Sequence, residues 1–136
     1  AAALATIRKM QRINSPKKLV SIGNKTRLIL QRAADKSQLD INFFGSSCLT
    51  SFELDVKNWQ NSLTLYTQEM MKLGVLASDR VYANLAHNRY ALLYFEKCLN
   101  KVFPILKQKD KENNTFDMIE GPVRIPGFGR IGIKND

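Results

Sequence analysis

The chain has 136 residues, of which 44% are hydrophobic, and this is enough to bury one domain-sized core. The composition excludes disorder along the whole chain. The 21 basic and 12 acidic residues give a net charge of +9, which permits an anionic partner but identifies none. The sequence contains no run of about 18 apolar residues, so it predicts no membrane span.

The first seven residues (AAALATI) are helix formers and bring no initiator methionine, polar cap or signal-like segment, so we expect a piece of a longer protein. A helix break is predicted at Asn14, because Ser15 suits an N-cap and Pro16 a first helical position. The next helix is amphipathic with a basic outer face, and Gly23 inside it predicts a close approach to another element. Its apolar stripe consists of Leu19, Ile22, Thr26, Ile29 and Ala33.

Alternating apolar and polar residues at 39–43 and 50–54 predict two strands, or one bent strand. Between them lie Gly45, Ser46 and Ser47. Such small residues suit a bulge, a turn or a place where another molecule approaches the backbone, and a plain hairpin bend is an equal alternative.

In the second half, a helix over 63–73 is predicted to end at Gly74 in a left-handed cap, and the apolar residues 75–77 are a candidate return to the sheet. Asn88 is the predicted cap of the strongest helix, which Pro104 is expected to kink or end. The polar residues 107–114 then predict a solvated connector. The expected fold class is α/β, in an α+β two-layer form: helices cover a small antiparallel or mixed sheet in a domain over 1–106, followed by a connector and tail over 107–136.

No complete catalytic, cofactor or metal site is predicted in this chain. Residues 127–132 match G-x-G-x-x-G, but no helix follows to hold a pyrophosphate. His87 is the only histidine, so we expect packing or capping rather than metal binding. Cys48 and Cys98 have no metal or redox spacing and are expected to be reduced cytosolic thiols. The basic residues are dispersed and the aromatic residues follow helical stripes, which does not favour nucleic-acid binding.

Longer patterns are more informative. Residues 66–78 read YTQEMMKLGVLAS, residues 82–88 read YANLAHN, and residues 121–131 run from GPV to GFGRI. They resemble the T-Q-E-M-L-K-x-G-I-L-A-S, Y-A-H-T and closing G-P-V…G-F-x-R-L patterns of class III, pyridoxal-phosphate-dependent aminotransferases, in their glutamate-1-semialdehyde aminotransferase-like branch. Residues 1–7 resemble the helix after the family's G-T-x-x-G-N-P segment.

This resemblance implies the C-terminal small domain of a fold-type-I enzyme, an aminotransferase or aminomutase, that closes over an amino-acid or amino-sugar-like substrate. It implies that pyridoxal phosphate, the Schiff-base lysine and the residues that hold the cofactor belong to a large domain upstream of Ala1. The chain alone is then expected to be inactive and to bind no cofactor. A cytoplasmic homodimer, with no membrane or nucleic-acid partner, is expected.

Arg80 matches the arginine of an R-x-x-P-P-L segment that binds the substrate carboxylate in many class III members. Both prolines of the segment are missing, and the semialdehyde branch generally lacks this arginine, so an ordinary surface arginine is an equal alternative. Ser78, Ser46 and Ser47 are further substrate-binding candidates. A second hypothesis is a non-catalytic module whose basic helices bind an acidic protein or nucleic acid.

Overall fold

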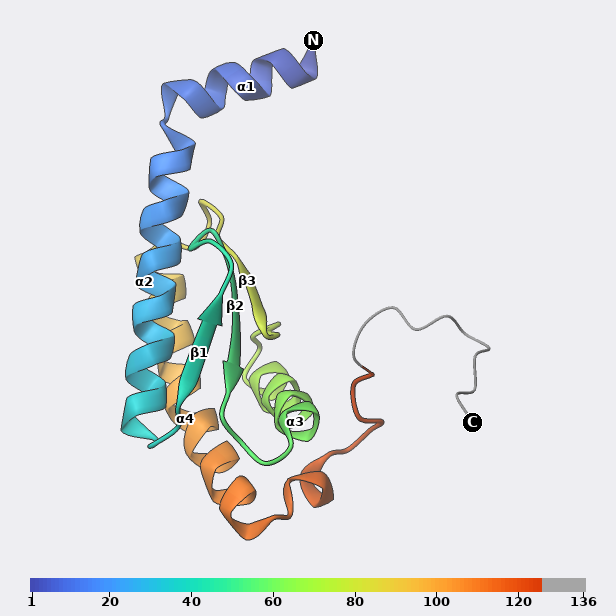
Figure 1. Ribbon diagram of the computed structural model, residues 1–136. Coiled ribbons are helices and arrows are strands. Elements are labelled where there is room, and N and C mark those ends of the chain that lie inside the picture. The colour runs from blue at the N-terminus through green and yellow to red at the C-terminus, as the bar shows by residue number, and fades with distance from the viewer. Residues whose placement is uncertain (126–136) are drawn as a thin grey trace.

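The computed structural model describes residues 1–125, and the G-x-G-x-x-G match and most of the closing motif lie outside this part. The described residues form the expected small α+β unit, in which helices pack on one three-stranded antiparallel sheet (Figure 1). The elements in chain order are α1 (Ala2–Arg12), α2 (Ser15–Lys36), β1 (Ile41–Phe44), β2 (Leu49–Leu54), α3 (Trp59–Lys72), β3 (Arg80–Tyr82), α4 (Arg89–Glu112) and a short 3₁₀ turn (Thr115–Met118).

The sheet has the order β1-β2-β3, with β2 in the middle. Phe44 pairs with Ser51 and Ser51 pairs with Arg80, so these three residues form one row across the sheet. Paired residues share a face, and alternate residues point to opposite faces. Phe52 and Leu54 are buried on the face that the helices cover, whereas the row containing Arg80 lies on the other face.

The chain breaks before α2 where the sequence predicts it, but the cap differs. Asn14 adopts the left-handed conformation (φ 49°) and is the N-cap, without a side-chain capping bond. Ser15 is the first helical residue, so its predicted role as N-cap is wrong. Pro16 still lies in the first turn, where its missing N–H costs no intrahelical bond.

Gly23 makes the close approach that its place inside a helix predicts. Its neighbour is the β1–β2 hairpin: a Cβ built on Gly23 would lie 1.9 Å from the carbonyl oxygen of Ser47. One turn later, Arg27 donates to the Gly45 carbonyl at 2.7 Å and to Thr50 Oγ1 at 2.8 Å. The segment containing Ser46 and Ser47 is therefore a hairpin bend fastened to α2.

The ends of α3 and α4 follow the sequence closely, with one exception. Asn88 caps α4, because its side chain accepts a hydrogen bond from the N–H of Ala91, and Gly74 has φ +74° after α3. The returning strand, however, is Arg80–Tyr82, so the prediction of a strand at 75–77 is wrong. The later start lets Phe52 donate its N–H to the Asp79 carbonyl at 2.9 Å.

Helix α4 passes Pro104 and ends only at Glu112. Of the two predicted effects of Pro104, a kink or an early end, the early end is therefore wrong, and the predicted connector over residues 107–112 is wrong as well. Polar contacts support these last turns. Lys109 pairs with Glu112 at 2.7 Å, and Asp110 accepts the backbone N–H of Lys57 at 2.8 Å. A helix ending needs no buried apolar face when its side chains form such bonds.

The core lies between the sheet and helices α2, α3 and α4, which pack against one another in Figure 1. Tyr66 is at its centre, with its ring 5.8 Å from that of Phe52 and 6.1 Å from that of Phe103. Helix α1 takes no part, since it projects from the body and all its residues are exposed. The largest fully buried side chains include Tyr66, Phe103, Leu30, Leu54, Leu63, Leu65, Met70, Leu99 and Leu106.

Candidate functional site

Arg80 lies on the face of the sheet that the helices leave uncovered. Its guanidinium takes part in none of the hydrogen bonds or ion pairs formed within residues 1–125. Three large side chains on this face are about half exposed or more: Phe44 (52%), Leu49 (55%) and Tyr82 (62%). An arginine without a partner beside apolar and aromatic side chains is suited to bind a planar anion such as a carboxylate.

Ser78 is exposed just before β3, and its hydroxyl donates to Asp79 Oδ1 at 2.7 Å. The same carboxylate forms an ion pair with Arg124 at 3.3 Å. Ser78 thus lies two residues from Arg80 in the chain and near it in space. Its hydroxyl is already engaged, so it offers a ligand only its lone pairs.

Ser46 and Ser47 lie at the hairpin bend, and their contacts are structural. The Ser46 carbonyl accepts the N–H of Leu49 at 3.0 Å, and the Ser47 carbonyl accepts the Thr50 hydroxyl at 3.0 Å. The bend closes one end of the sheet, whereas Ser78 precedes β3 on the side of Phe52. The structure therefore brings Arg80 and Ser78 together, and does not bring Ser46 and Ser47 to them.

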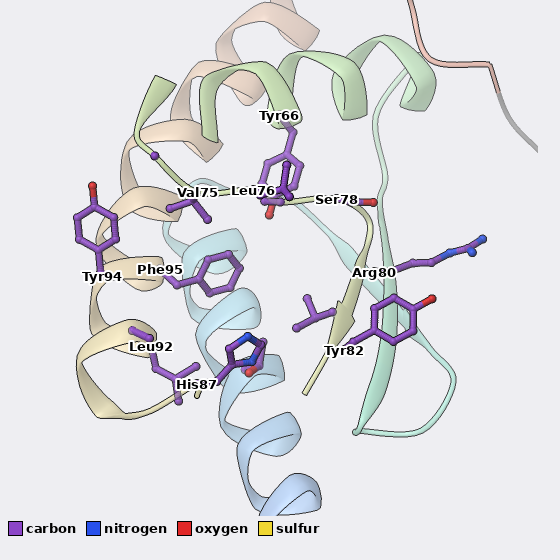
Figure 2. A pocket seen from close by; sticks show the side chains of 15 residues that line it. Tyr66, Val75, Leu76, Ser78, Arg80, Tyr82, His87, Leu92, Tyr94 and Phe95 are labelled. Atoms are coloured by element: carbon purple, nitrogen blue, oxygen red, sulfur yellow. The ribbon is translucent and has the colours of Figure 1, made fainter. Parts of the chain in front are cut away.

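A cleft of about 460 Å³ opens on the helix-covered side of β3. Segment 74–82 forms one wall and the first turns of α4 the other, with Tyr66 and Thr26 contributed by α3 and α2 (Figure 2). Leu92, Phe95 and Val75 line it with apolar surface. Arg80, Ser78 and Tyr82 also border the cleft, but their labelled side chains point away from it in Figure 2.

The hydroxyl of Tyr66 is the unusual group of this cleft. Tyr66 is 1% exposed, and its hydroxyl has no hydrogen-bond partner within the described structure. Burial, and to a smaller extent the neighbouring Cys98, raises the pKa of Tyr66 well above its ordinary value. The phenol consequently stays protonated and available as a donor.

His87 lies at the other end of the cleft from Tyr66 in Figure 2. Asn84 Oδ1 accepts the N–H of Ala86 at 2.8 Å, which fixes the orientation of this amide. Its Nδ2 lies 3.0 Å from His87 Nε2 and is the donor of that hydrogen bond. Of the two roles predicted for His87, packing and capping, the structure shows packing beside the start of α4, because Asn88 is the cap of this helix.

Polar residues of the 66–78 pattern have a structural role, because they hold the chain that follows the 3₁₀ turn. Gln68 donates to the Met118 carbonyl at 2.9 Å and accepts the N–H of Glu120 at 2.8 Å. Lys72 bridges Glu69 at 2.8 Å and Glu120 at 2.6 Å. Their spacing along α3 forms one stripe, against which residues 118–120 lie.

The Glu69 carboxylate predicts a pH dependence of stability. Burial raises its pKa, but hydrogen bonds from Lys72 and Gln68 and the charge of Lys72 outweigh burial, and the pKa falls below 4.5. The folded-state pKa is thus below the unfolded value. The stabilisation is complete above the unfolded pKa and is lost as the pH falls through the folded pKa.

We therefore expect the free energy of unfolding, measured by urea denaturation, to fall between about pH 6 and about pH 3. Glu69→Gln should flatten this pH dependence and lower stability near neutral pH by about 1 kcal/mol. Glu53→Gln, at an exposed strand residue that forms no ion pair within residues 1–125, is the control and should keep the wild-type slope. If Glu69→Gln and Glu53→Gln showed the same dependence of unfolding free energy on pH, Glu69 would not be its source.

Residues 1–125 contain no group of three or more histidine, cysteine or acidic side chains arranged to hold a metal ion. Over the same residues, no helix has the length and apolar character needed to cross a membrane.

Comparison of the chain with family models, curated proteins and solved structures gave no match. The resemblance to class III aminotransferases accordingly stays a prediction that rests on the sequence patterns.

Sequence reasoning missed two candidate functional features. It assigned Tyr66 and Phe95 to helical core stripes, where only the tertiary structure reveals a cleft beside them. It also overlooked the uncovered sheet face. A signal for that face was present in Phe43 and Phe44, because adjacent aromatic residues at a strand end put one ring on each face.

Proposed function

We propose that the chain is the C-terminal small domain of a class III, pyridoxal-phosphate-dependent aminotransferase or aminomutase, similar to glutamate-1-semialdehyde aminotransferase, and closes over the substrate. The observation that carries this proposal is the unpaired Arg80 guanidinium on a sheet face without helices in the described part of the chain. A closing domain needs one face that is left open for the substrate and the opposite domain. The 66–78 pattern adds support from sequence.

On this proposal, Arg80 receives the carboxylate of an amino-acid-like substrate. Two parallel N–H···O bonds fix the orientation of the carboxylate as well as its position. Phe44 and Tyr82, on the same face, exclude water when the domain closes, and a drier site strengthens the ion pair. Ser78, two residues before Arg80, is a secondary contact for the same substrate.

The cofactor implied here, pyridoxal phosphate, accepts the electron pair released when the substrate loses its α-proton. On this proposal, its site belongs to the large domain. Within residues 1–125, no lysine borders the cleft at β3, and none belongs to the paired residues of the sheet. The proposal assigns the Schiff-base lysine to a large domain.

Absorbance spectroscopy tests the proposal. The natural-length protein that carries this chain is expected to show the band of a lysine–cofactor imine, and an amino-acid donor should shift it. The 136-residue chain, mixed with pyridoxal phosphate, should show no stoichiometric imine at one defined lysine. A single stoichiometric imine in this chain, or no cofactor binding by the natural-length protein, would overturn the proposal.

Arg80→Ala in the natural-length protein is expected to raise KM for a carboxylate substrate roughly 30-fold, since a charge-assisted pair contributes about 2 kcal/mol. Arg80→Lys should raise KM less than Arg80→Ala does, because lysine keeps the positive charge but cannot form the two parallel hydrogen bonds of a guanidinium. The control is Arg89→Ala, at an exposed arginine that begins α4. Unchanged KM in Arg80→Ala would leave Arg80 an ordinary surface residue.

We further propose that the parent enzyme is a cytoplasmic homodimer. Both cysteines, Cys48 and Cys98, are free thiols, which is typical of a reducing compartment. The exposed apolar residues of α1, among them Leu4 and Ile7, are candidates for burial against the large domain or a second copy. Size-exclusion chromatography with light scattering of the natural-length protein tests the dimer.

A second candidate function is favoured by a basic groove of about 660 Å³ between α2 and the start of α4. Lys18, Lys25 and Arg32 follow one another at intervals of seven residues along α2, and so lie on one stripe. Leu28 and Leu93 give the groove an apolar floor and are about half exposed. This pattern fits an acidic amphipathic helix of another protein.

Nucleic acid fits the groove less well, because its lining contains no phenylalanine, tyrosine or tryptophan from the described residues on which a base could stack. We expect an acidic amphipathic peptide to bind the chain more tightly than its scrambled counterpart, and to bind Lys25→Glu roughly 10-fold more weakly. Lys17→Glu, on the same helix outside the groove, is the control. Equal losses in both variants, or preference for an oligonucleotide, would exclude this candidate.

A further inference from the structure

We propose that the cleft between segment 74–82 and α4 binds a small, uncharged and largely apolar ligand that carries one hydrogen-bond acceptor for Tyr66. This site is separate from the Arg80 face, since the two lie on opposite sides of β3 (Figure 2). The proposal therefore does not rest on the function proposed above.

The shape and lining of the cleft point to a small molecule. Its volume of about 460 Å³ lies in the range of small-molecule pockets, and residues of four elements line it. Phe95, Leu92, Val75 and Val81 supply apolar and aromatic surface. A ligand with one or two aromatic rings would bury most of its surface between them.

Among the polar groups around the cleft, one buried hydrogen-bonding position is vacant. The Thr26 hydroxyl donates to the Ile22 carbonyl at 3.0 Å, the Tyr94 hydroxyl to the Leu73 carbonyl at 2.8 Å, and Ser78 to Asp79. Of the cleft-lining side chains, Tyr66 has the only buried polar atom that is without a partner in the described structure. Such a group is costly to bury unless something satisfies it.

The orientation of Tyr66 fits this role. Figure 2 shows its ring entering from α3, with the hydroxyl directed toward the cleft. The ring itself is held by Phe52 and Phe103, so the hydroxyl is a fixed donor. A ligand carbonyl or ether oxygen that reaches it gains a hydrogen bond in an apolar setting.

The ligand is expected to be uncharged. Among the described residues, Arg80 is the only side chain around the cleft with a permanent charge, and it points away in Figure 2. The Nε2 atom of His87 is engaged with the Asn84 amide. A charged ligand would thus lose its hydration without gaining an ion pair.

A pair of probes tests the site on the 136-residue chain: 2-acetylnaphthalene, which has a carbonyl acceptor, and 2-ethylnaphthalene, which has the same ring system and chain length but lacks the carbonyl oxygen. Binding is followed by backbone amide NMR shifts. We expect the acetyl compound to perturb amides in 74–82 and 91–95, and to bind roughly 10-fold more tightly than the ethyl compound, which corresponds to one hydrogen bond.

Variants identify the groups responsible. Tyr66→Phe removes only the unpartnered hydroxyl and should reduce the affinity for the acetyl compound to that for the ethyl compound. Ala91→Phe narrows the cleft and should weaken both compounds, whereas Val20→Phe, at an exposed residue of α2 outside the cleft, should weaken neither. If Tyr66→Phe fails to fold, the comparison of the two probes on the wild-type chain still shows whether a carbonyl acceptor improves binding in the cleft.

Three outcomes would overturn the proposal. The first is the absence of amide shifts in the cleft. The second is equal affinity for the two probes, which would leave Tyr66 without a role. The third is a set of cleft shifts that follows protein concentration without any probe, because a second copy of the chain would then occupy the cleft.

Discussion

Gly23→Ala is expected to lower the free energy of unfolding by about 3 kcal/mol, although alanine is the better helix former. A Cβ on residue 23 would lie 1.9 Å from the carbonyl oxygen and 2.4 Å from the carbonyl carbon of Ser47, both backbone atoms. The hairpin has little freedom to retreat. Arg27 holds the Gly45 carbonyl, and Thr50 holds the Ser47 carbonyl. Either α2 or the hairpin must shift, and several of these bonds are lost.

Urea denaturation of Gly23→Ala beside Asn24→Ala measures this effect. Asn24 is the next residue of the same helix and is exposed, so its replacement changes helix propensity without any clash. Asn24→Ala should be neutral or slightly more stable, by roughly 0.5 kcal/mol. Stability of Gly23→Ala at or above that of Asn24→Ala would show that the helix and hairpin separate without cost.

Phe103→Ala is expected to destabilise the protein by about 4 kcal/mol, through lost burial and the cavity left behind. Phe103 is fully buried on α4, and its ring lies 6.1 Å from that of Tyr66. Domains of this size are stable by only about 5–15 kcal/mol, so the variant should be close to unfolding at ambient temperature. Without the Phe103 ring, the Tyr66 ring would lose one of its packing partners. The Tyr66 hydroxyl, which is the donor in the cleft, would then no longer be held in place.

Two further variants on α4 serve as comparisons for Phe103→Ala. Leu93→Ala, at a residue that is 51% exposed, should change stability by less than about 0.5 kcal/mol. Phe103→Leu keeps most of the apolar volume and should lose about 1.5 kcal/mol. Thermal and urea unfolding measure all three. A Phe103→Ala chain that unfolds like Leu93→Ala would contradict the assignment of Phe103 to the core.

Much of the fold was predictable because the local signals are strong. Alternation at 39–43 and 50–54, the glycine at 74 and the asparagine at 88 act within a few residues, and the structure confirms the elements they predict. The errors concern boundaries. Residues 75–77 are as apolar as a strand but pair with no strand of the described sheet. The residues that pair with β2 are Arg80–Tyr82, which begin three residues after this apolar run. Likewise α4 continues past Leu106, and its last turns contain the Lys109–Glu112 ion pair and the hydrogen bond from the Lys57 N–H to Asp110.

The candidate site was predictable only in part. Arg80 and Ser78 are neighbours in the chain and remain neighbours in the fold. Ser46 and Ser47 were grouped with them by residue type alone, and the hairpin geometry separates them. The cleft had no sequence signature, because its walls come from four elements and each wall residue resembles ordinary core.

By itself, the sequence determined where the helices and the first two strands lie, apart from their ends. It also determined that α2 must come close to another element at Gly23 and that one domain-sized core is present. Those properties depend on side chains a few residues apart. Tertiary structure alone decided that the neighbour of Gly23 is Ser47, that Arg80 lies on the uncovered face, and that the Tyr66 hydroxyl is buried beside a cleft without a partner among the described residues. These facts depend on how the sheet and helices pack together. Contacts between residues that are distant in the chain produce no periodic pattern in the sequence.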